Sequence, residues 1–364
     1  MTLDDIALTL HTGLGAITIA RLVEHFGSAE EVYAAGENAL VEAGLKRPIA
    51  HSVALRETHA RAEAEYLYMQ QRGIKAVAVG DAHYPRLLAE AADRPHVLYY
   101  IGNIEVLSAH TLAVVGTRNS TSYGSIMTDK MVEYLSGRVA GLCIVSGLAF
   151  GTDSNAHRAA LRYGLPTAAV IPSSLPDIVP SEHTALAKEI IERGGVILSE
   201  FHSGNRTARN SFVSRNRIIA AVSEGTLLVE SKASGGSMTT AEFATGYNRT
   251  LLALMGRATD PTSAGTNRLI VNRTASAVCS GEDIVREMYW DIADAEVGTL
   301  NFDTPEPSRE EKGLLSKMPA GEAISMDELC ERCGVSRGEL SIMLVELEMD
   351  GAVRRLPGDS YIKL

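Results

Sequence analysis

The sequence predicts an α/β protein in which a large parallel sheet is flanked by a helical N-terminal domain and a small C-terminal domain. Residues 1–72 show helical periodicity throughout. From Ile74, short β-branched runs alternate with helical stretches, the pattern of a parallel sheet. After an acidic stretch, the last residues form a helix–turn–helix pattern followed by two short strands. A chain of 364 residues with 45% hydrophobic residues can bury the core that this architecture needs.

The N-terminal domain, residues 1–72, is predicted to be all-helical and helix-hairpin-helix-like or SAM-like. Gly13 and Gly15 separate two short helices. Ser28 and Glu31 have the spacing of a capping box for the next helix. A small-residue turn between helices can present backbone N–H groups to a phosphate, but it also occurs in plain helix packing. Both interpretations stay open.

Residues 73–290 are predicted to form an extended Rossmann-like parallel sheet. The predicted strands are 75–79, 111–115, 142–146, 167–171, 196–199, 226–230 and 250–255. A helical stretch lies between most of them, which is the arrangement of a doubly covered sheet. Ligands of such sheets bind beyond the carboxyl ends of the strands. The loops after these strands are therefore the candidates for function.

The C-terminal part is predicted to be a linker, residues 291–308, and a winged-helix domain, residues 309–364. The linker is acidic and carries Pro305 and Pro307. Serines 325 and 336 are predicted to cap the two helices of the last domain. Its second helix, predicted at 339–350, contains four acidic residues and no lysine or arginine, whereas a DNA-reading helix normally offers basic and amide groups. This composition favours a protein-contact or autoregulatory role.

Composition excludes several classes of protein. A net charge of −11 argues against a surface that is basic all over, but residues 201–223 contain four arginines (206, 209, 215 and 217) and no acid. Four cysteines do not form a disulfide framework, and the Cys330–Cys333 pair lacks partner ligands for zinc. No apolar run is long enough for a membrane span, and acidic residues stand where a signal peptide is basic. We expect a cytoplasmic protein without metal, cofactor or membrane contact.

The loop after the strand at 111–115 has the parts of an anion site. It contains Gly116, Thr117 and Arg118, followed by Ser122 and Gly124. Glycine lets a backbone approach a phosphate, hydroxyls donate to its oxygens, and arginine engages two oxygens at once. The loop lacks the Gly-x-Gly-x-x-Gly of dinucleotide binding and the Gly-Lys-Ser/Thr of a Walker A loop.

Three further loops offer anion-binding groups at the same predicted sheet edge. The first contains Ser146, Gly147, Phe150 and Gly151; the second contains Phe212, Arg215, Asn216 and Arg217; the third contains Lys232 with several hydroxyls. We expect Asp153 to cap the helix after the first loop and His157 to make a buried hydrogen bond. Glu200 and Glu230 end strands, where they serve either catalysis or the orientation of arginines. Converging anion sites suit a nucleic-acid backbone or a nucleotide.

These motifs together resemble the DNA-processing protein family called DprA or Smf. The segments VVGTRNSTSYG, VSGLAFGTDSNAH, FVSRNRIIAAVS and ESKASGGSMTTAEFA occur in family order, within a match that runs from Tyr84 to Ile270. The resemblance implies an extended Rossmann domain that forms homodimers, binds single-stranded DNA and helps to load the recombinase RecA during natural transformation.

The resemblance also implies roles for individual residues. Arg118 would hold a DNA phosphate in a pocket shaped by its own loop and by the loop after the next strand, and Arg215, Arg217 and Lys232 would extend the track. Phe212 would stack on a base or pack in the core. The sequence departs from the family at Val179-Pro180 and at Leu254-Met-Gly256, which are expected to affect loop detail more than the phosphate pocket.

The main alternative is a nucleotide-acting enzyme, a phosphoribohydrolase with a Rossmann-like fold of the lysine-decarboxylase type. Those enzymes carry a Pro-Gly-Gly-x-Gly-Thr loop with a nearby catalytic glutamate, whereas this chain has Ser-Gly-Gly-Ser-Met-Thr. No nucleophile stands next to a general base, and no metal carboxylates accompany a nucleotide loop. We therefore expect a binding protein without catalytic residues.

Overall fold

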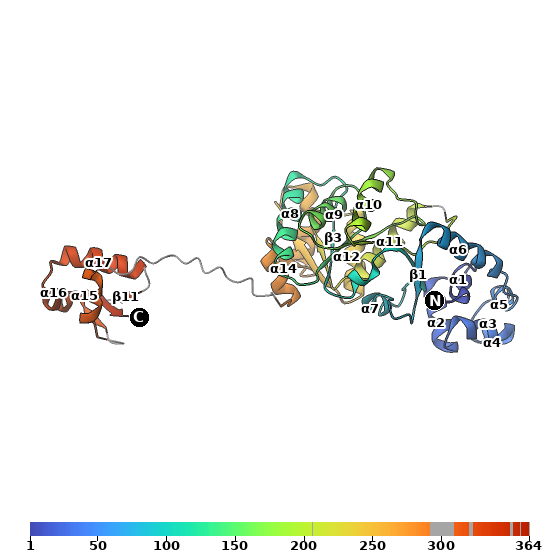
Figure 1. Cartoon of the computed structure of the whole chain (residues 1–364), viewed down its shortest axis with the longest axis horizontal. Coiled ribbons are helices and arrows are strands. Elements are labelled where there is room, and N and C mark those ends of the chain that lie inside the picture. Colours follow the sequence, from blue (N-terminus) through green and yellow to red (C-terminus); the bar gives the residue numbers. More distant parts are fainter. Residues whose placement is uncertain (206, 292–308, 320–322, 350–351, 357, 364) are drawn as a thin grey trace. The chain divides into compact units, whose positions relative to one another are not determined.

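The structure is a computed structural model that describes residues 1–364 except 206, 292–308, 320–322, 350–351, 357 and 364. The chain divides into two compact units, Met1–Ala293 and Asp294–Leu364. Figure 1 shows the elements of both units, and each unit is described by itself. The predicted linker, 291–308, lies almost entirely outside the described residues.

The first unit is built on a sheet that, among the described residues, has nine strands in the order β1-β2-β6-β5-β4-β3-β7-β8-β9. The strands are β1 Lys75–Ala78, β2 Val97–Gly102, β3 Thr111–Val115, β4 Cys143–Ser146, β5 Thr167–Val170, β6 Val196–Ser199, β7 Gly225–Leu228, β8 Thr250–Leu254 and β9 Ser276–Val278. The seven predicted strands are confirmed, with bounds that differ by up to two residues.

Strand β2 corrects the expectation of a purely parallel sheet. It runs antiparallel to both of its neighbours, β1 and β6, while every other pair in the sheet is parallel. Because β2 is antiparallel to both neighbours, β1 runs in the same direction as β6 and the central strands, and β2 and β1 extend the sheet beyond β6. The carboxyl ends of β3, β4 and β7 still share one edge, because these three strands are adjacent and parallel.

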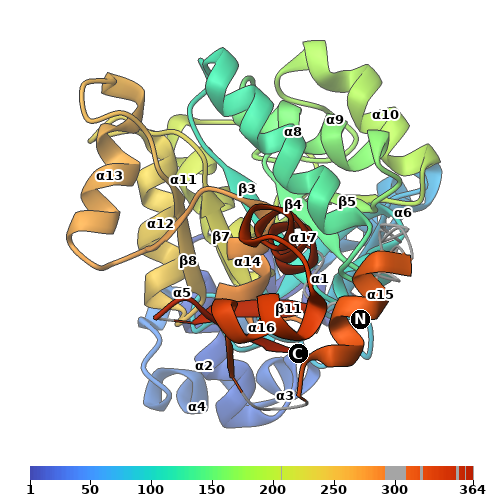
Figure 2. The same cartoon turned by 90° about the vertical axis from the view of Figure 1, so that its left-hand side faces the viewer.

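Helices cover both faces of this sheet. Alternate residues of β3 explain the layers, since Leu112 and Val114 pack toward one helical layer and Ala113 and Val115 toward the other. The first layer contains α8 Ser122–Ser136, α9 Thr152–Arg162 and α14 Gly281–Met288; the second contains α7 Arg86–Ala89, α11 Arg209–Ala221, α12 Gly236–Gly246 and α13 Ala264–Val271. Figure 2 shows α8 and α9 side by side. Helix α10, Thr184–Glu192, packs nearer the N-terminal helices.

The N-terminal segment is helical, as predicted. Its helices are α1 Leu3–Thr9, α2 Ala16–Phe26, α3 Ala29–Ala34, α4 Gly36–Glu42, α5 Arg47–Ala54 and α6 His59–Arg72. Ser28 caps α3 by accepting from the Glu31 N–H at 3.1 Å. Apolar side chains of these helices share one buried core with Tyr99 of β2 and Ile197 of β6. The helical segment and the sheet therefore belong to one compact unit.

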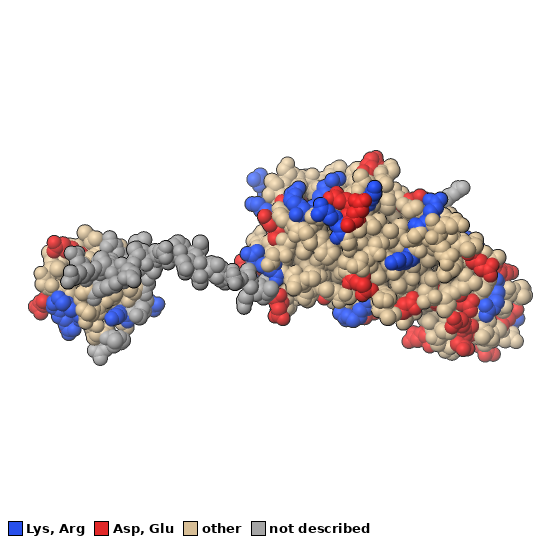
Figure 3. Space-filling model, in the orientation of Figure 1, with Lys and Arg blue, Asp and Glu red and all other residues tan. Residues whose placement is uncertain are grey.

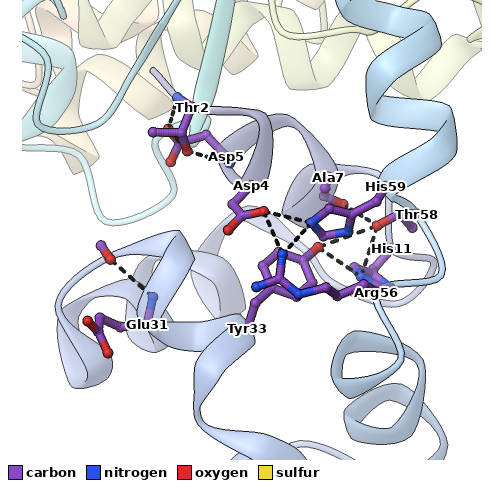
Figure 4. A network of polar contacts seen from close by, with 11 residues as sticks. Thr2, Asp4, Asp5, Ala7, His11, Glu31, Tyr33, Arg56, Thr58 and His59 are labelled. Atoms are coloured by element: carbon purple, nitrogen blue, oxygen red, sulfur yellow. Dashed lines mark hydrogen bonds and ion pairs between the residues drawn. The ribbon is translucent and has the colours of Figure 1, made fainter.

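A polar network ties the N-terminal helices together (Figure 4). The Asp4 carboxylate accepts from His59 at 2.6 Å and from Arg56 at 3.2 Å. His11 is buried, with its Nε2 3.0 Å from the hydroxyls of both Tyr33 and Thr58. Burial lowers the pKa of His11 below its ordinary value, so this histidine is neutral at pH 7.

A second polar contact joins α1 to the sheet and gives a testable pH dependence. Asp5 Oδ1 lies 2.8 Å from Nε2 of the buried His96, just before β2. Burial alone would raise the pKa of Asp5, but the hydrogen bonds from His96 and Thr2 outweigh it and lower the pKa. An acid with a lowered pKa stabilises the fold above its unfolded pKa, and this stabilisation is lost as the pH falls through the folded pKa.

Replacement of Asp5 by Asn is therefore expected to lower the free energy of unfolding at pH 7 by about 1–3 kcal/mol, the cost of disrupting a buried charged hydrogen bond. The difference from the wild type should shrink as the pH falls below about 4, where Asp5 is protonated in the unfolded chain. Urea unfolding at pH 7 and pH 3.5 measures both values. A difference that stays constant with pH would contradict this role of Asp5.

The second unit has the predicted winged-helix arrangement. Its elements are α15 Arg309–Lys317, β10 Ile324–Ser325, α16 Met326–Cys333, α17 Arg337–Met349, β11 Val353–Leu356 and β12 Ser360–Lys363, with sheet order β10-β12-β11. Helix α17 begins two residues before its predicted start and so includes Arg337. That arginine pairs with Asp327 and Asp359. Ile342 and Val345 are exposed on α17, which supports the protein-contact interpretation of this helix.

Candidate nucleic-acid interface

A cleft of about 800 Å³ opens where β3, β4 and β7 end. Its lining combines cationic and neutral polar groups, and the only carboxylate among the described lining residues is Asp153. The cationic and neutral polar side chains are Thr117, Arg118, Thr207, Arg215, Asn216, Ser231, Lys232, Ser234, Ser237, Thr239 and Thr240. Hydroxyl, amide and cationic donors without a matching set of acids suit an anionic ligand.

Arg118 stands at the junction of three hollows. It lines the cleft, a slot of about 90 Å³ beside Phe150 and Phe212, and a shallow groove at the start of α8. Its guanidinium carbon lies 5.1 Å from the centre of the Phe212 ring, within the range of a cation–π contact. The side chain is exposed and at the same time oriented, as a phosphate contact requires.

The loop that carries Arg118 is fixed by hydrogen bonds to Glu230, the second residue after β7. The Thr117 N–H donates to the Glu230 carbonyl at 2.8 Å. The Thr121 N–H and hydroxyl donate to the Glu230 carboxylate at 2.9 and 2.6 Å, and the Ser120 hydroxyl donates to it at 3.2 Å. The sequence left catalysis and the orientation of arginines open for Glu230, and this geometry supports the second role, because the loop that Glu230 holds carries Arg118.

The glycines of these loops serve packing. A Cβ at Gly116 would collide with Thr152, one at Gly124 with the Glu230 carboxylate, and one at Gly147 with the Arg215 guanidinium. A Cβ at Gly151, whose φ is +76°, would collide with the carbonyls of Thr117 and Arg118. The sequence explained these glycines by close approach to a phosphate, whereas the structure shows that they let the loops approach one another.

Arg215 and Arg217, which the sequence predicted to contact DNA, bind other groups of the protein. Arg215 is 4% exposed, and it donates to the carbonyls of Gly147 and Val170. Burial lowers its pKa to about 10, so it stays charged at pH 7. Arg217 is 9% exposed and pairs with Glu200. Of the two, Arg215 also lines the cleft and the slot, and its Nε has no hydrogen-bond partner among the described residues, whereas Arg217 lines none of the hollows. That these arginines extend a phosphate track stays a prediction.

The prediction for Asp153 is wrong, whereas that for His157 is confirmed. Gly151 occupies the N-cap of α9, and the buried Asp153 accepts from the Ala149 N–H at 3.4 Å. His157 makes the predicted buried hydrogen bond, from Nδ1 to the Thr167 hydroxyl at 2.7 Å. Burial lowers the pKa of His157 to about 3, so the ring is neutral. Among the described residues, no group of three or more His, Cys, Asp or Glu side chains could hold a metal ion.

The structure brings most of the other predicted residues to the three hollows. Gly116, Thr117, Arg118, Phe212, Arg215, Asn216 and Lys232 line the cleft; Gly147 and Phe150 line the slot; Ser122 and Gly151 line the groove. Gly124, Ser146 and Arg217 line none of them. Ser146 is buried and donates to the Val114 carbonyl at 2.7 Å.

Sequence reasoning missed two contributions to the site. Thr207, which precedes α11, adds a hydroxyl to the cleft. Val179 and Pro180 form one side of the slot. The departure from the family pattern at 179–180 therefore falls beside Arg118 and Phe212, closer to the site than expected. Thr207 lies within the arginine-rich stretch 201–223 but carries no charge, and Val179 and Pro180 come from a loop that is remote in sequence from Arg118.

Comparison with known proteins gives matches along most of the chain. Residues 75–289 match the family model of DNA recombination-mediator protein A, and residues 301–359 match the DprA winged helix domain. Protein Smf of Escherichia coli is 32% identical over 307 residues, which cover 83% of this chain and 80% of Smf.

Two solved structures are similar. DprA from Streptococcus pneumoniae has a TM-score of 0.68 and 28% identity, covering 79% of this chain and 98% of that one. DprA from Helicobacter pylori, described for its single-stranded DNA binding mode, has a TM-score of 0.53 and 28% identity, covering 59% of this chain and 96% of that one. With a family model that spans more than half of its length, the chain belongs to the DprA (Smf) family of DNA-processing proteins.

Proposed function

We propose that this chain binds single-stranded DNA across the cleft, with Arg118 as the central phosphate contact. The observation that carries this proposal is the position of Arg118, exposed, held over Phe212 and shared by three adjoining hollows. Lys232 adds a second cation, and the hydroxyls of the cleft add neutral donors. Phe150, which is 44% exposed, and Phe212 offer ring faces in the slot for sequence-tolerant base stacking.

The charge distribution supports a local site. Figure 3 shows acidic side chains gathered over the N-terminal helices, a region that includes Glu30, Glu31, Glu37 and Glu42 of α3 and α4. Such a surface repels a polyanion. We therefore expect a DNA strand to bind at the cleft, where Asp153 is the one carboxylate among the described lining residues.

The biological role that we propose is the protection of incoming DNA and the loading of RecA during transformation, by a homodimer. The DNA-processing relatives and the single-stranded DNA binding described for the Helicobacter pylori protein support the DNA part. RecA loading and dimerisation rest on the family resemblance. In a loading assay, the chain should shorten the time that RecA needs to assemble on a strand coated by single-strand binding protein.

A catalytic role has less support from the site. The Glu230 carboxylate is turned to the loop and accepts three hydrogen bonds there. Glu242 is exposed and does not line the cleft. Neither carboxylate is placed to act on a nucleotide in the cleft.

The proposal is tested by titrating the full chain into fluorescently labelled oligo-dT and following the anisotropy. We expect binding that weakens linearly on a plot of log affinity against log salt, because each neutralised phosphate releases counterions. A duplex of the same length should bind more weakly, and a mixed-sequence strand should bind about as well as oligo-dT. Absence of salt-dependent binding to any single strand would refute the proposal.

A further inference from the structure

Glu230 is a buried acid at the centre of an anion-binding surface. Its side chain is 1% exposed, and it lies beneath the loop that carries Arg118. A negative charge in this place opposes the binding of a phosphate by Coulomb repulsion. For Glu230 to favour binding, its contacts must have a role that outweighs this repulsion.

The contacts of Glu230 supply that role, because they hold the Arg118 loop at both ends. The backbone carbonyl of Glu230 fixes Thr117, the residue before Arg118. The carboxylate fixes Ser120 and Thr121, at the other end of the loop. The residues before and after Arg118 and Asn119 are thus both hydrogen-bonded to one residue, Glu230.

Gly124 completes this arrangement from the side of α8. A Cβ at position 124 would overlap the Glu230 carboxylate, so only glycine leaves room for it. The glycine that the sequence assigned to the phosphate pocket therefore serves the buried acid.

We infer that Glu230 is a positioning residue, which fixes the Arg118 loop in the conformation that receives a DNA phosphate. This inference rests on the proposed function. For the DNA affinity of the Glu230→Gln variant, the positioning role and a purely electrostatic effect predict opposite changes. Glu230→Gln removes the repelling charge, so a purely electrostatic effect would tighten DNA binding. Loss of positioning would weaken it, because the amide presents a donor where the carboxylate accepted from Thr121 or Ser120.

The experiment measures oligo-dT affinity for E230Q and E230A in the wild-type and R118A backgrounds. We expect E230A to weaken binding about tenfold and E230Q to weaken it by a smaller factor, as expected for loss of hydrogen bonds that orient the loop. In the R118A background, E230A should change the affinity less than about twofold, because the group that it positions is absent.

Glu224→Gln is the matched control. Glu224 lies at the opposite end of the same strand, where it accepts from the Trp290 indole at 2.8 Å, away from the cleft. E224Q should leave oligo-dT affinity unchanged. Thermal melts establish which variants are folded, and if E230A is unfolded, G124A, which displaces the carboxylate with a methyl group, replaces it in the same cycle.

The outcomes separate this inference from the proposed function. Tighter binding by E230Q, or full additivity of E230A and R118A, would overturn the positioning role while wild-type binding and its loss in R118A still support the DNA site. Failure of the wild-type chain to bind oligo-dT would overturn the proposed function itself. Coupling between positions 118 and 230 is the result that a merely structural role of Glu230 would not produce.

Discussion

Replacement of Arg118 by alanine is expected to weaken oligo-dT binding by about 10- to 150-fold, the equivalent of roughly 1.5–3 kcal/mol for hydrogen bonds to a charged group. The reason is geometric, because this one exposed guanidinium serves the cleft, the slot and the groove. Its removal takes away a planar fork that is already oriented over Phe212. The salt dependence should change as well, with a slope that falls by about 0.7 for each phosphate of the single strand that the variant no longer neutralises.

Two further variants make this measurement specific. Arg158→Ala removes an exposed arginine of α9 that lines none of the three hollows, so its affinity should equal that of the wild type. Arg118→Lys keeps the charge and loses the fork, so it should bind with intermediate affinity. Wild-type affinity of R118A at moderate salt would show that the DNA site lies elsewhere.

The local pattern of apolar and polar residues predicted most of the strands and helices, because this pattern depends on which side chains are buried. The strand at 111–115 is completely buried, and its apolar, β-branched run is visible in the sequence without any partner. Strand β2 is also an apolar run, VLYYIG, but its direction depends on pairing with β1 and β6, the latter nearly a hundred residues away along the chain. Strand β9 has three residues, too few for a period to appear.

The sequence indicated which residues lie near the site, but it did not indicate which groups their side chains contact. An arginine in the sequence shows a charge, but its acceptor is set by the fold. Arg215 donates to Gly147, 68 positions earlier, and Arg217 pairs with Glu200 from another loop. Arg118, in contrast, is exposed, in a loop that is held at both ends by hydrogen bonds to Glu230. Clustering of like charges along the sequence therefore could not indicate that Arg215 and Arg217 contact protein groups.

The Arg217–Glu200 pair leads to the second large effect. Arg217→Ala is expected to lower the free energy of unfolding by about 3–5 kcal/mol, because it leaves a buried carboxylate without its partner. Burial already raises the pKa of Glu200 despite the nearby arginine. In the variant, ionised Glu200 destabilises the fold, so the defect should be largest at pH 7. It should shrink as the pH falls toward 4 and the carboxyl becomes neutral.

Urea unfolding of the wild type, R217A and the double variant E200Q/R217A, together with the oligo-dT affinity of R217A, decides between a structural and a DNA-binding role of Arg217. The double variant E200Q/R217A removes both charges and should recover part of the stability that R217A loses. At a temperature where R217A remains folded, its oligo-dT affinity should stay within about twofold of the wild type, since the guanidinium does not line the cleft. A stable R217A protein with a large loss of affinity would instead mean that the arginine leaves Glu200 to contact the strand, and that the phosphate track extends beyond Arg118 and Lys232 after all.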